Sequence, residues 1–392
     1  MQTIIHQYQP LIHLISCALN QCRPDDRVLR EIDFAVLKKQ SDFHGVSAMA
    51  ALAILSADDG QGSIPAPIIR DCKEIYFRSV RNSVLLDREV AHVCSALAEA
   101  HIEHALLKGS VLSHRYPKPG MREMCDVDML IDDSMTAQAR DVMESLGYTV
   151  ERYNMDHHDV YVKEPFLCFE LHNKLFSDVY ADYLHYFLNC REKLLPTGGN
   201  EYEKRFSDDD FYLFQIAHSC KHLHKSGIGL RVLTDLFVIR RRFDLHREYI
   251  ECEAAKLGIT KDEQLLTSLA EKLFSHPKQP QLPSFSAEEE NVLAFMLKSG
   301  ANGTLEQQIS NQLPESIYSG NTDFSASKMR YIRRRIFPDP ESYKTSHPFF
   351  YRHKAARPLL PFVRLRDSFI YRKGKLRNEL RTLRAFSNKN KQ

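Results

Sequence analysis

Apolar residues recur at two different spacings along this 392-residue chain. Over residues 1–70 and 68–101 they return every three or four positions, which is the spacing of one face of an α-helix. Between 102 and 172 short apolar runs take over, bounded by Gly, Pro and charged residues, as is typical of strands. Beyond 206 the helical spacing returns. The pattern predicts a sheet-containing core with helical regions before and after it.

Within that core the alternation of strand and helix patterns indicates a mixed sheet with helices on one side. A helix is expected over 135–146, because Asp133 and Ser134 can cap its start and Gly147 suits the position after its end. The fold class is therefore α+β, with a mixed β-sheet core and flanking α-helical domains. Strands are predicted at 102–107, 126–131, 148–151, 159–163 and 166–172.

Changes in composition suggest where domains begin and end. The stretch DDGQGSIPAP at 58–67 combines Gly, Ser and Pro and is predicted to be a linker. Ser207 and the three acids after it are expected to cap a helix, and a second helix is expected at 228–243. We predict an N-terminal helical region at 1–67, a core at 68–195, a helical domain closing the cleft at 196–325 and a basic helical segment at 326–392.

The overall composition is that of a water-soluble globular protein, with 43% hydrophobic and 27% charged residues. No apolar run approaches the roughly 18–20 residues that a membrane span needs, and the first residues lack the basic start of a signal peptide. The nine cysteines form no C-x-x-C pair, and their odd number suits a reducing compartment. We expect a cytoplasmic protein.

Charge is distributed unevenly along the chain. Residues 326–392 hold 19 Lys and Arg against 4 Asp and Glu, which leaves 34 of the 53 basic and 47 of the 51 acidic residues for the rest. Apolar residues within this basic segment fall at helical spacing, which predicts a basic amphipathic helix. They are Leu365, Phe369, Leu376, Leu380 and Leu383.

Three hypotheses account for this helix, and the sequence leaves them open. It can dock on the acidic body of the same chain, or bind phosphates of a nucleic acid. It can also lie on an anionic membrane, which would make the protein peripheral to the inner membrane surface.

The stretch HALLKGSVLSHRYPKPGMREMCDVDMLI at 104–131 carries the clearest chemical signal. We interpret it as a strand, a tight turn with a short helix, a loop and a second strand. Asp126 and Asp128 stand two positions apart, so their side chains point to the same face of the second strand. Carboxylates this close repel each other, and ion pairs or metals usually explain such a site. Together with a Gly-Ser turn that can present backbone N–H groups to phosphate, they suggest metal-dependent chemistry on a nucleotide.

The same stretch resembles a known signature. Leu107-Lys108-Gly109, then Tyr116-Pro117, then Arg122 through Ile131 is similar to the pattern of the DNA polymerase β-like nucleotidyltransferase superfamily. Within it, the string resembles a bacterial family of uncharacterised nucleotidyltransferases. The resemblance implies a nucleotidyltransferase-type core that transfers a nucleoside monophosphate from an NTP to a hydroxyl acceptor and releases pyrophosphate. It also implies two Mg²⁺ ions, with Mn²⁺ as an alternative.

A third carboxylate is expected on a neighbouring strand. Glu170 stands in the otherwise apolar run FLCFELH, where burial is costly unless the carboxylate is paired or bound to metal. The alternative is a Glu on an edge strand that faces water. We predict Asp126, Asp128 and Glu170 as the catalytic and metal-binding residues, with Glu170, or the metal-bound site as a whole, as general base.

Further residues are predicted to contact the nucleotide. Gly109 and Ser110 would cradle phosphates, while Lys108 and Arg122 would neutralise their charge. His172 matches the resembling pattern and shares a face with Glu170. The alternatives are an ordinary strand-to-helix turn, an exposed Lys108 and a hydrogen-bonded His172. His157 and His158 are interpreted as surface residues, although a His also recurs near here in the resembling pattern.

The segment HSCKHLHKSGIGLRVLTD at 218–235 continues the resemblance, which implies a helical lid lined by Lys221, His222, Arg231 and Asp235. The alternative is a polar network between helices that includes an Arg231–Asp235 pair at i, i+4. A zinc site at His218 and His222 lacks an evident third ligand.

The sequence does not name the acceptor, which can be a sugar or other small molecule, a protein side chain or an RNA end. A protein of another class also fits the motif: a nucleotide-binding regulatory or toxin–antitoxin-type protein without turnover. The set of Asp126, Asp128 and Glu170 favours the enzyme, because a protein without turnover has no physical need for three clustered acids.

Overall fold

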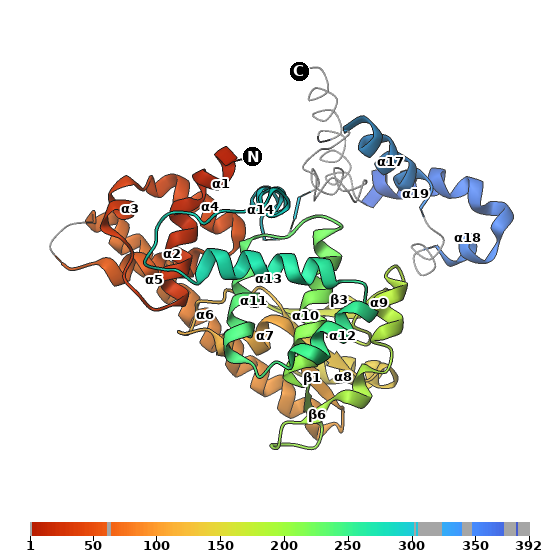
Figure 1. Ribbon diagram of the computed structural model, residues 1–392. Helices are drawn as coiled ribbons and strands as arrows, with labels where there is room; N and C mark the ends of the chain where they lie inside the picture. Colours follow the sequence, from red (N-terminus) through yellow and green to blue (C-terminus); the bar gives the residue numbers. More distant parts are fainter. Residues whose placement is uncertain are drawn as a thin grey trace. The chain divides into compact units, whose positions relative to one another are not determined.

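The structure is a computed structural model that describes residues 2–60, 64–301, 303–304, 324–338, 347–371 and 382. These residues form two compact units. Figure 1 labels the elements from which the units are built, where there is room. The first unit comprises Met1–Cys220 with Leu230–Phe285, and the second comprises Lys221–Gly229 with Ser286–Gln392, as far as each is described. The division into four domains stays a prediction.

The first unit contains a seven-stranded mixed sheet in the order β3-β4-β5-β2-β1-β7-β6. The pairs β2–β5 and β1–β7 are parallel, and the others are antiparallel. The α+β class and the five predicted strands are confirmed. β6 and β7 were not predicted, because they are very short and carry no alternating apolar pattern. The strands are β1 His104–Leu106, β2 Val127–Ile131, β3 Thr149–Arg152, β4 His158–Lys163, β5 Leu167–His172, β6 Leu195–Pro196 and β7 Glu203–Arg205.

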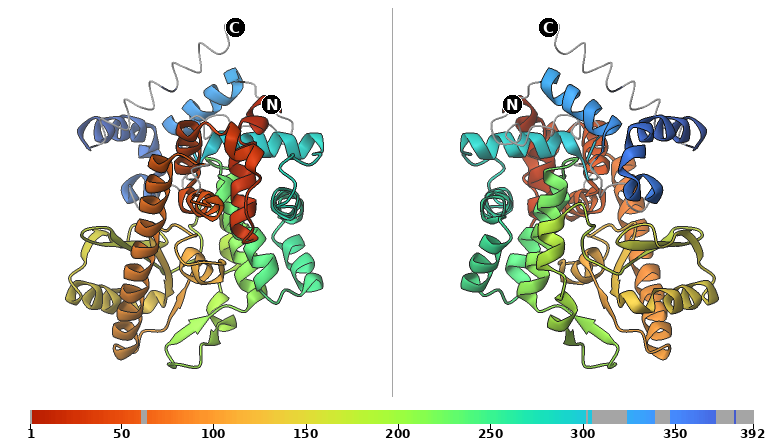
Figure 2. Two further views of the ribbon diagram at one scale, coloured as in Figure 1. Left: turned by 90° about the vertical axis from the view of Figure 1, so that its left-hand side faces the viewer. Right: turned by 90° about the vertical axis from the view of Figure 1, so that its right-hand side faces the viewer.

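One face of the sheet packs against helices. Val127, Met129 and Ile131 of β2 join a buried apolar cluster with α6 (Ala66–Glu99) and α8 (Thr136–Ser145). Figure 2 shows α6 extending from the N-terminal helices along the sheet. Because side chains alternate along a strand, the residues between these apolar ones, Asp128 and Leu130, point to the opposite face.

Helices from both ends of the unit's sequence pack together. α2 (Gln9–Leu19) contacts both α5 (Ser47–Ala57) and α13 (Thr260–Phe274). The predicted cap of α10 is confirmed, since the Asp210 backbone N–H donates to Ser207 Oγ at 3.1 Å. The remaining helices of this unit are α1 Gln2–Gln7, α2 Gln9–Leu19, α3 Asp26–Glu31, α4 Phe34–His44, α5 Ser47–Ala57, α7 Lys108–Leu112, α9 Ala181–Tyr186, α10 Asp208–Leu223 (whose last three residues fall in the second unit), α11 Leu230–Arg242, α12 Arg247–Lys256 and α13 Thr260–Phe274; short 3₁₀ turns are η1 Ser113–Arg115, η2 Asp133–Met135 and η3 Cys190–Lys193.

The second unit is helical where it is described. Its elements are α14 Ala287–Ser299, α17 Phe324–Ile336, α18 Pro348–Arg352, η5 Lys354–Leu359 and α19 Leu360–Tyr371. α19 covers the first part of the predicted basic amphipathic helix, and the rest of that helix lies outside the described residues except Thr382. None of the helices described is both long enough and apolar enough to cross a membrane.

Candidate active site

Two of the predicted carboxylates lie side by side on adjacent parallel strands. Asp128 of β2 is in register with Glu170 of β5. Phe169 belongs to the buried cluster on one face of the sheet, so Glu170 points to the other face, as Asp128 does. β5 is an internal strand, which excludes the alternative of an edge-strand Glu. One oxygen of Asp128, one of Glu170 and a ring nitrogen of His172 lie within 4.8 Å of one another.

Asp128 is buried, with 6% of its surface exposed, and two side chains compensate its charge. Lys108 Nζ lies 2.5 Å and His172 Nε2 lies 2.8 Å from its Oδ1. Burial alone would raise the pKa of Asp128, but Lys108 and His172 hold it well below the usual value. Burial would likewise raise the pKa of Glu170, whereas the hydrogen bond from His172 lowers it. Both carboxylates are therefore ionised at neutral pH.

Asp126 comes just before β2, and the residue as a whole is exposed although neighbouring groups desolvate its carboxylate. Desolvation, and then the charges of Asp128 and Glu170, raise the pKa of Asp126. This mutual repulsion of three carboxylates is what a bound cation relieves. Carboxylate oxygens are the ligands that Mg²⁺ takes, so the donor set fits a divalent ion of that class.

The turn between β1 and α7 is tied to the strand that carries Asp128. Leu107 N–H donates to the Asp128 carbonyl at 2.9 Å, and Ser110 Oγ donates to the Leu107 carbonyl at 2.7 Å. Lys108 has a φ of +47°, a left-handed conformation that costs energy for a residue with a side chain and is typical of functional sites. In this conformation the Lys108 side chain points toward Asp128, with which its ammonium forms an ion pair. A Cβ on Gly109 would lie 3.0 Å from Met124 Sδ, so the loop before β2, which carries Met124, packs closely on this turn.

Arg122 and Asp235 bind each other inside the unit. Arg122 Nε and Nη2 donate to the two Asp235 carboxylate oxygens at 2.8 and 3.0 Å, and Tyr116 Oη donates to Oδ1 at 2.7 Å. Although burial favours the neutral form, Asp235 raises the pKa of Arg122 well above its ordinary value. Asp235 thus pairs with Arg122 rather than with Arg231, and this network ties the loop before β2 to α11. Nucleotide contacts by Arg122 and Asp235 stay a prediction.

Arg231, at the start of α11, lies in a different environment. It is half-buried, and within the described parts of the chain it forms no ion pair. Burial and the neighbouring Arg122 lower the pKa of Arg231, while the charge of Arg231 offsets part of the rise in the pKa of Asp126. Its positive charge therefore lies near the carboxylates without a carboxylate of its own. Lys221 and His222 belong to the second unit, and their predicted nucleotide contacts are not tested by these distances.

The interpretation of His157 and His158 as surface residues is wrong. Only 12% of each side chain is exposed, and both rings lie against that of His172, with centroids 5.6 and 5.0 Å away. The reason is the antiparallel pairing of β4 with β5, which sets His158 opposite His172. The residues around His158 do not show by themselves that β4 pairs with β5.

Glu123 is a functional-site neighbour that sequence reasoning missed. Its Oε2 accepts a hydrogen bond of 3.1 Å from the backbone N–H of Ala48, in the first turn of α5. A carboxylate is favourable at the positive end of a helix dipole. Glu123 therefore anchors the loop before β2 to the N-terminal helices, a role with no signal in the motif itself.

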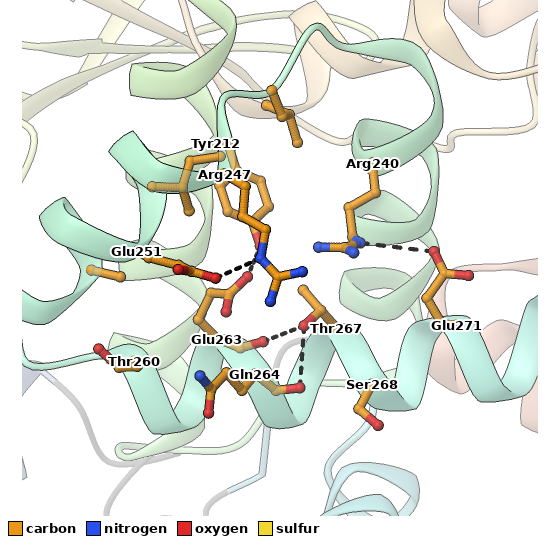
Figure 3. A pocket seen from close by; sticks show the side chains of 13 residues that line it. Tyr212, Arg240, Arg247, Glu251, Thr260, Glu263, Gln264, Thr267, Ser268 and Glu271 are labelled. Atoms are coloured by element: carbon orange, nitrogen blue, oxygen red, sulfur yellow. Dashed lines mark hydrogen bonds and ion pairs between the residues drawn. The ribbon is translucent and has the colours of Figure 1, made fainter.

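A separate polar pocket of about 410 Å³ lies among α10, α11, α12 and α13 (Figure 3). None of the predicted site residues lines it. Its charged groups pair with one another: Arg247 Nε lies 2.5 Å from Glu251 Oε1, and Arg240 Nε lies 3.8 Å from Glu271 Oε1. We therefore place the candidate active site at the carboxylates and not in this pocket.

Comparison with known proteins identifies the family of the chain. No curated protein and no solved structure matches the chain. A family model described as "uncharacterised nucleotidyltransferase" matches residues 30–275, a range that holds the whole sheet, both carboxylate-bearing strands and α11. The match covers more than half of the chain and supports a general function in nucleotidyl transfer. The chain belongs to this family of uncharacterised nucleotidyltransferases.

Proposed function

We propose that the protein transfers a nucleoside monophosphate from an NTP to a hydroxyl acceptor, in a reaction that depends on Mg²⁺ and releases pyrophosphate. The observation that carries this proposal is the parallel pairing of β2 with β5, which sets Asp128 opposite Glu170. Asp126 precedes β2, and the charges of both carboxylates raise its pKa. Family membership supports the general reaction, and the carboxylate geometry supports the metal.

Asp126, Asp128 and Glu170 would hold the metal. When bound, two Mg²⁺ ions supply Lewis acidity and orient the α-phosphate for in-line attack. The acceptor oxygen then bonds to the α-phosphorus, the bond to the pyrophosphate oxygen breaks, and Glu170 takes the hydroxyl proton. Glu170 is ionised at neutral pH, because the hydrogen bond from His172 lowers its pKa.

Two cations are assigned to the triphosphate. Arg231 is half-buried near Asp126 and has no ion-pair partner among the residues described, so an anionic phosphate would supply one. Lys108 now neutralises Asp128, and a metal ion on that carboxylate would release its ammonium to the phosphates. Gly109, Ser110 and His172 are assigned to the same nucleotide.

The experiment that tests this function incubates the purified chain with each of four labelled NTPs, Mg²⁺ and a cell extract. We expect label from one or more NTPs to appear on an acceptor, which can be a sugar or other small molecule, a protein or an RNA. Identification of the labelled species separates these classes. NTP binding without any labelled product would favour a regulatory nucleotide-binding protein instead.

A matched pair of variants tests the assigned residues. Asp126→Ala combined with Asp128→Ala should abolish Mg²⁺-dependent NTP consumption, because the metal loses two carboxylates. Asp133→Asn removes an exposed acid five positions after Asp128 and should leave consumption unchanged. Circular dichroism checks that both variants fold. Full turnover by the folded double variant would refute the assignment.

A further inference from the structure

Two cysteine side chains meet at the end of α2. The backbone N–H of Cys22 donates to the Cys17 carbonyl at 3.0 Å, and that of Gln21 donates to the Ala18 carbonyl at 3.2 Å. Gln21 has a φ of +53°, the left-handed conformation that commonly follows the end of a helix. These features define a Schellman motif, in which the side chains of the first and last of six residues contact each other. In this chain those two residues are Cys17 and Cys22.

The two thiols are in contact, but their surroundings differ. A hydrogen bond joins the two side chains. Cys17 is fully buried, and its Sγ lies 3.5 Å from the Pro277 carbonyl oxygen and 3.6 Å from His13 Nε2. Burial, and then the neighbouring Cys22, raises the pKa of the Cys17 thiol, so Cys17 keeps its proton at neutral pH. Cys22 is partly exposed and is therefore the thiol that a dissolved oxidant reaches.

We propose that Cys17 and Cys22 form an intramolecular disulfide when the protein reacts with a hydroperoxide such as hydrogen peroxide. A disulfide needs two cysteines whose side chains approach each other, and the Schellman motif supplies that approach. In a reducing compartment such a bond is usually transient and serves redox sensing. The proposal does not depend on nucleotidyl transfer.

The reaction takes place in two steps at the sulfur atoms. The Cys22 thiolate attacks one peroxide oxygen and the O–O bond breaks. The leaving hydroxide takes up the proton that the Cys22 thiol released and becomes water, and Cys22 becomes a sulfenic acid. The Cys17 sulfur then bonds to the Cys22 sulfur, the S–O bond breaks, and the Cys17 proton goes to the departing hydroxide as a second water. The two thiols thus lose two electrons and two protons, and hydrogen peroxide is reduced to water.

The new bond would leave the anchor of α2 in place. Ser16 Oγ and Asn20 Nδ2 both donate to the Phe274 carbonyl, at 3.1 and 2.8 Å, and neither contact uses a thiol. Oxidation would remove the donation from Cys17 Sγ to the Pro277 carbonyl. We therefore expect the oxidised protein to keep its fold, so the reaction can be followed on the native chain.

The test maps the thiols of the full chain by mass spectrometry. Reduced protein is treated with hydrogen peroxide, unfolded, alkylated at its free thiols and digested. We expect a disulfide between Cys17 and Cys22, which a thiol reductant should reverse. Cys17→Ala should prevent the bond and leave a sulfenic acid on Cys22 that dimedone traps, and Cys22→Ser should leave Cys17 as a free thiol. Cys252→Ser, at an exposed cysteine, is the control and should form the bond as fully as the unchanged protein.

Three results of this mapping would overturn the proposal. The first is complete alkylation of both Cys17 and Cys22 after peroxide treatment. The second is oxidation of Cys22 to a sulfinic acid while Cys17 remains a free thiol, because the buried thiol would then have failed to react. The third is a bond from Cys22 to a second chain, seen as a dimer without reductant. Far-ultraviolet circular dichroism before and after the treatment verifies that each protein is folded during the reaction.

Discussion

At the scale of single residues, the candidate site depends on how a buried negative charge is compensated. Asp128 is paired with Lys108 and His172, because a buried carboxylate without partners would be strongly unfavourable. Lys108 is held for this contact by a backbone conformation that residues with side chains rarely adopt. Its ammonium lies against the Asp128 carboxylate, where a bound metal ion would have its positive charge.

Lys108 should therefore compete with Mg²⁺. We expect Lys108→Met to tighten Mg²⁺ binding in the absence of nucleotide by about tenfold, equal to about 1.4 kcal/mol, because the competing charge is gone. NTP consumption should fall, because the phosphates lose a cation. Calorimetric titration with Mg²⁺ measures the first effect. Equal or weaker Mg²⁺ affinity in the variant would show that Lys108 does not compete.

Arg231 should act on the nucleotide, since its charge has no ion-pair partner among the described residues. We expect Arg231→Ala to raise the KM for NTP by about 10–100-fold, the range that corresponds to a lost hydrogen bond to a charged group. Arg231→Lys should recover part of the loss, because it keeps the charge without the forked donors. Arg242→Ala, at an exposed position on the same helix, is the control, and an equal effect there would contradict a specific role.

At the scale of elements, the loop between α7 and β2 positions the carboxylates through three separate anchors. Ser79 Oγ of α6 donates to the Gly120 carbonyl at 2.7 Å. Arg122 binds α11 through Asp235, and Glu123 binds the first turn of α5. The loop is consequently held on three helices, although it has little regular structure of its own.

Gly120 is the anchor where a side chain cannot fit. Its φ is +76°, and an added Cβ would lie 2.8 Å from the backbone nitrogen of Val80. We expect Gly120→Ala to destabilise the protein by about 1–3 kcal/mol, since backbone atoms must move. Gly147 has a similar φ of +84° with open space around it, so Gly147→Ala should lower the stability by only about 1 kcal/mol. Denaturant unfolding compares the two, and equal losses would mean that the contact with α6 contributes nothing.

At the scale of the whole molecule, the basic segment is the part that the carboxylate site does not explain. Residues 326–392 carry 19 Lys and Arg against 4 Asp and Glu. α19 forms the first part of the predicted helix, and the strongly basic residues after Tyr371 lie outside the described residues. Docking on the chain's own acidic body, binding to an anionic membrane and binding to nucleic acid all stay hypotheses.

Removal of residues 360–392 tests the membrane hypothesis. We expect the shortened chain to associate less with liposomes that contain anionic lipid, because each Lys or Arg near such a surface contributes about 1 kcal/mol. A similar loss is expected for a full-length variant with four substitutions, Arg372→Gln, Lys373→Gln, Lys375→Gln and Arg377→Gln. Added salt should weaken the association of the intact protein with anionic liposomes. Neutral liposomes are the control. Equal partitioning of intact and shortened chains would count against this hypothesis.

The sequence by itself determined the local elements and the motif. Short apolar runs bounded by Gly, Pro and charged residues specify strands such as β2 and β5, because both follow from the local sequence. The shared face expected for Asp126 and Asp128 stays a prediction, since Asp126 lies just before β2. The resemblance carried by these residues indicated the family correctly.

Only the tertiary structure decided which distant residues meet. Arg122 and Asp235 are 113 positions apart, and Glu123 and Ala48 are 75 apart. His157 and His158 looked like surface residues until the pairing of β4 with β5 put them against His172. Local patterns report which face of an element is buried, but strand order and helix packing select its neighbours, and these depend on the energy of the whole fold.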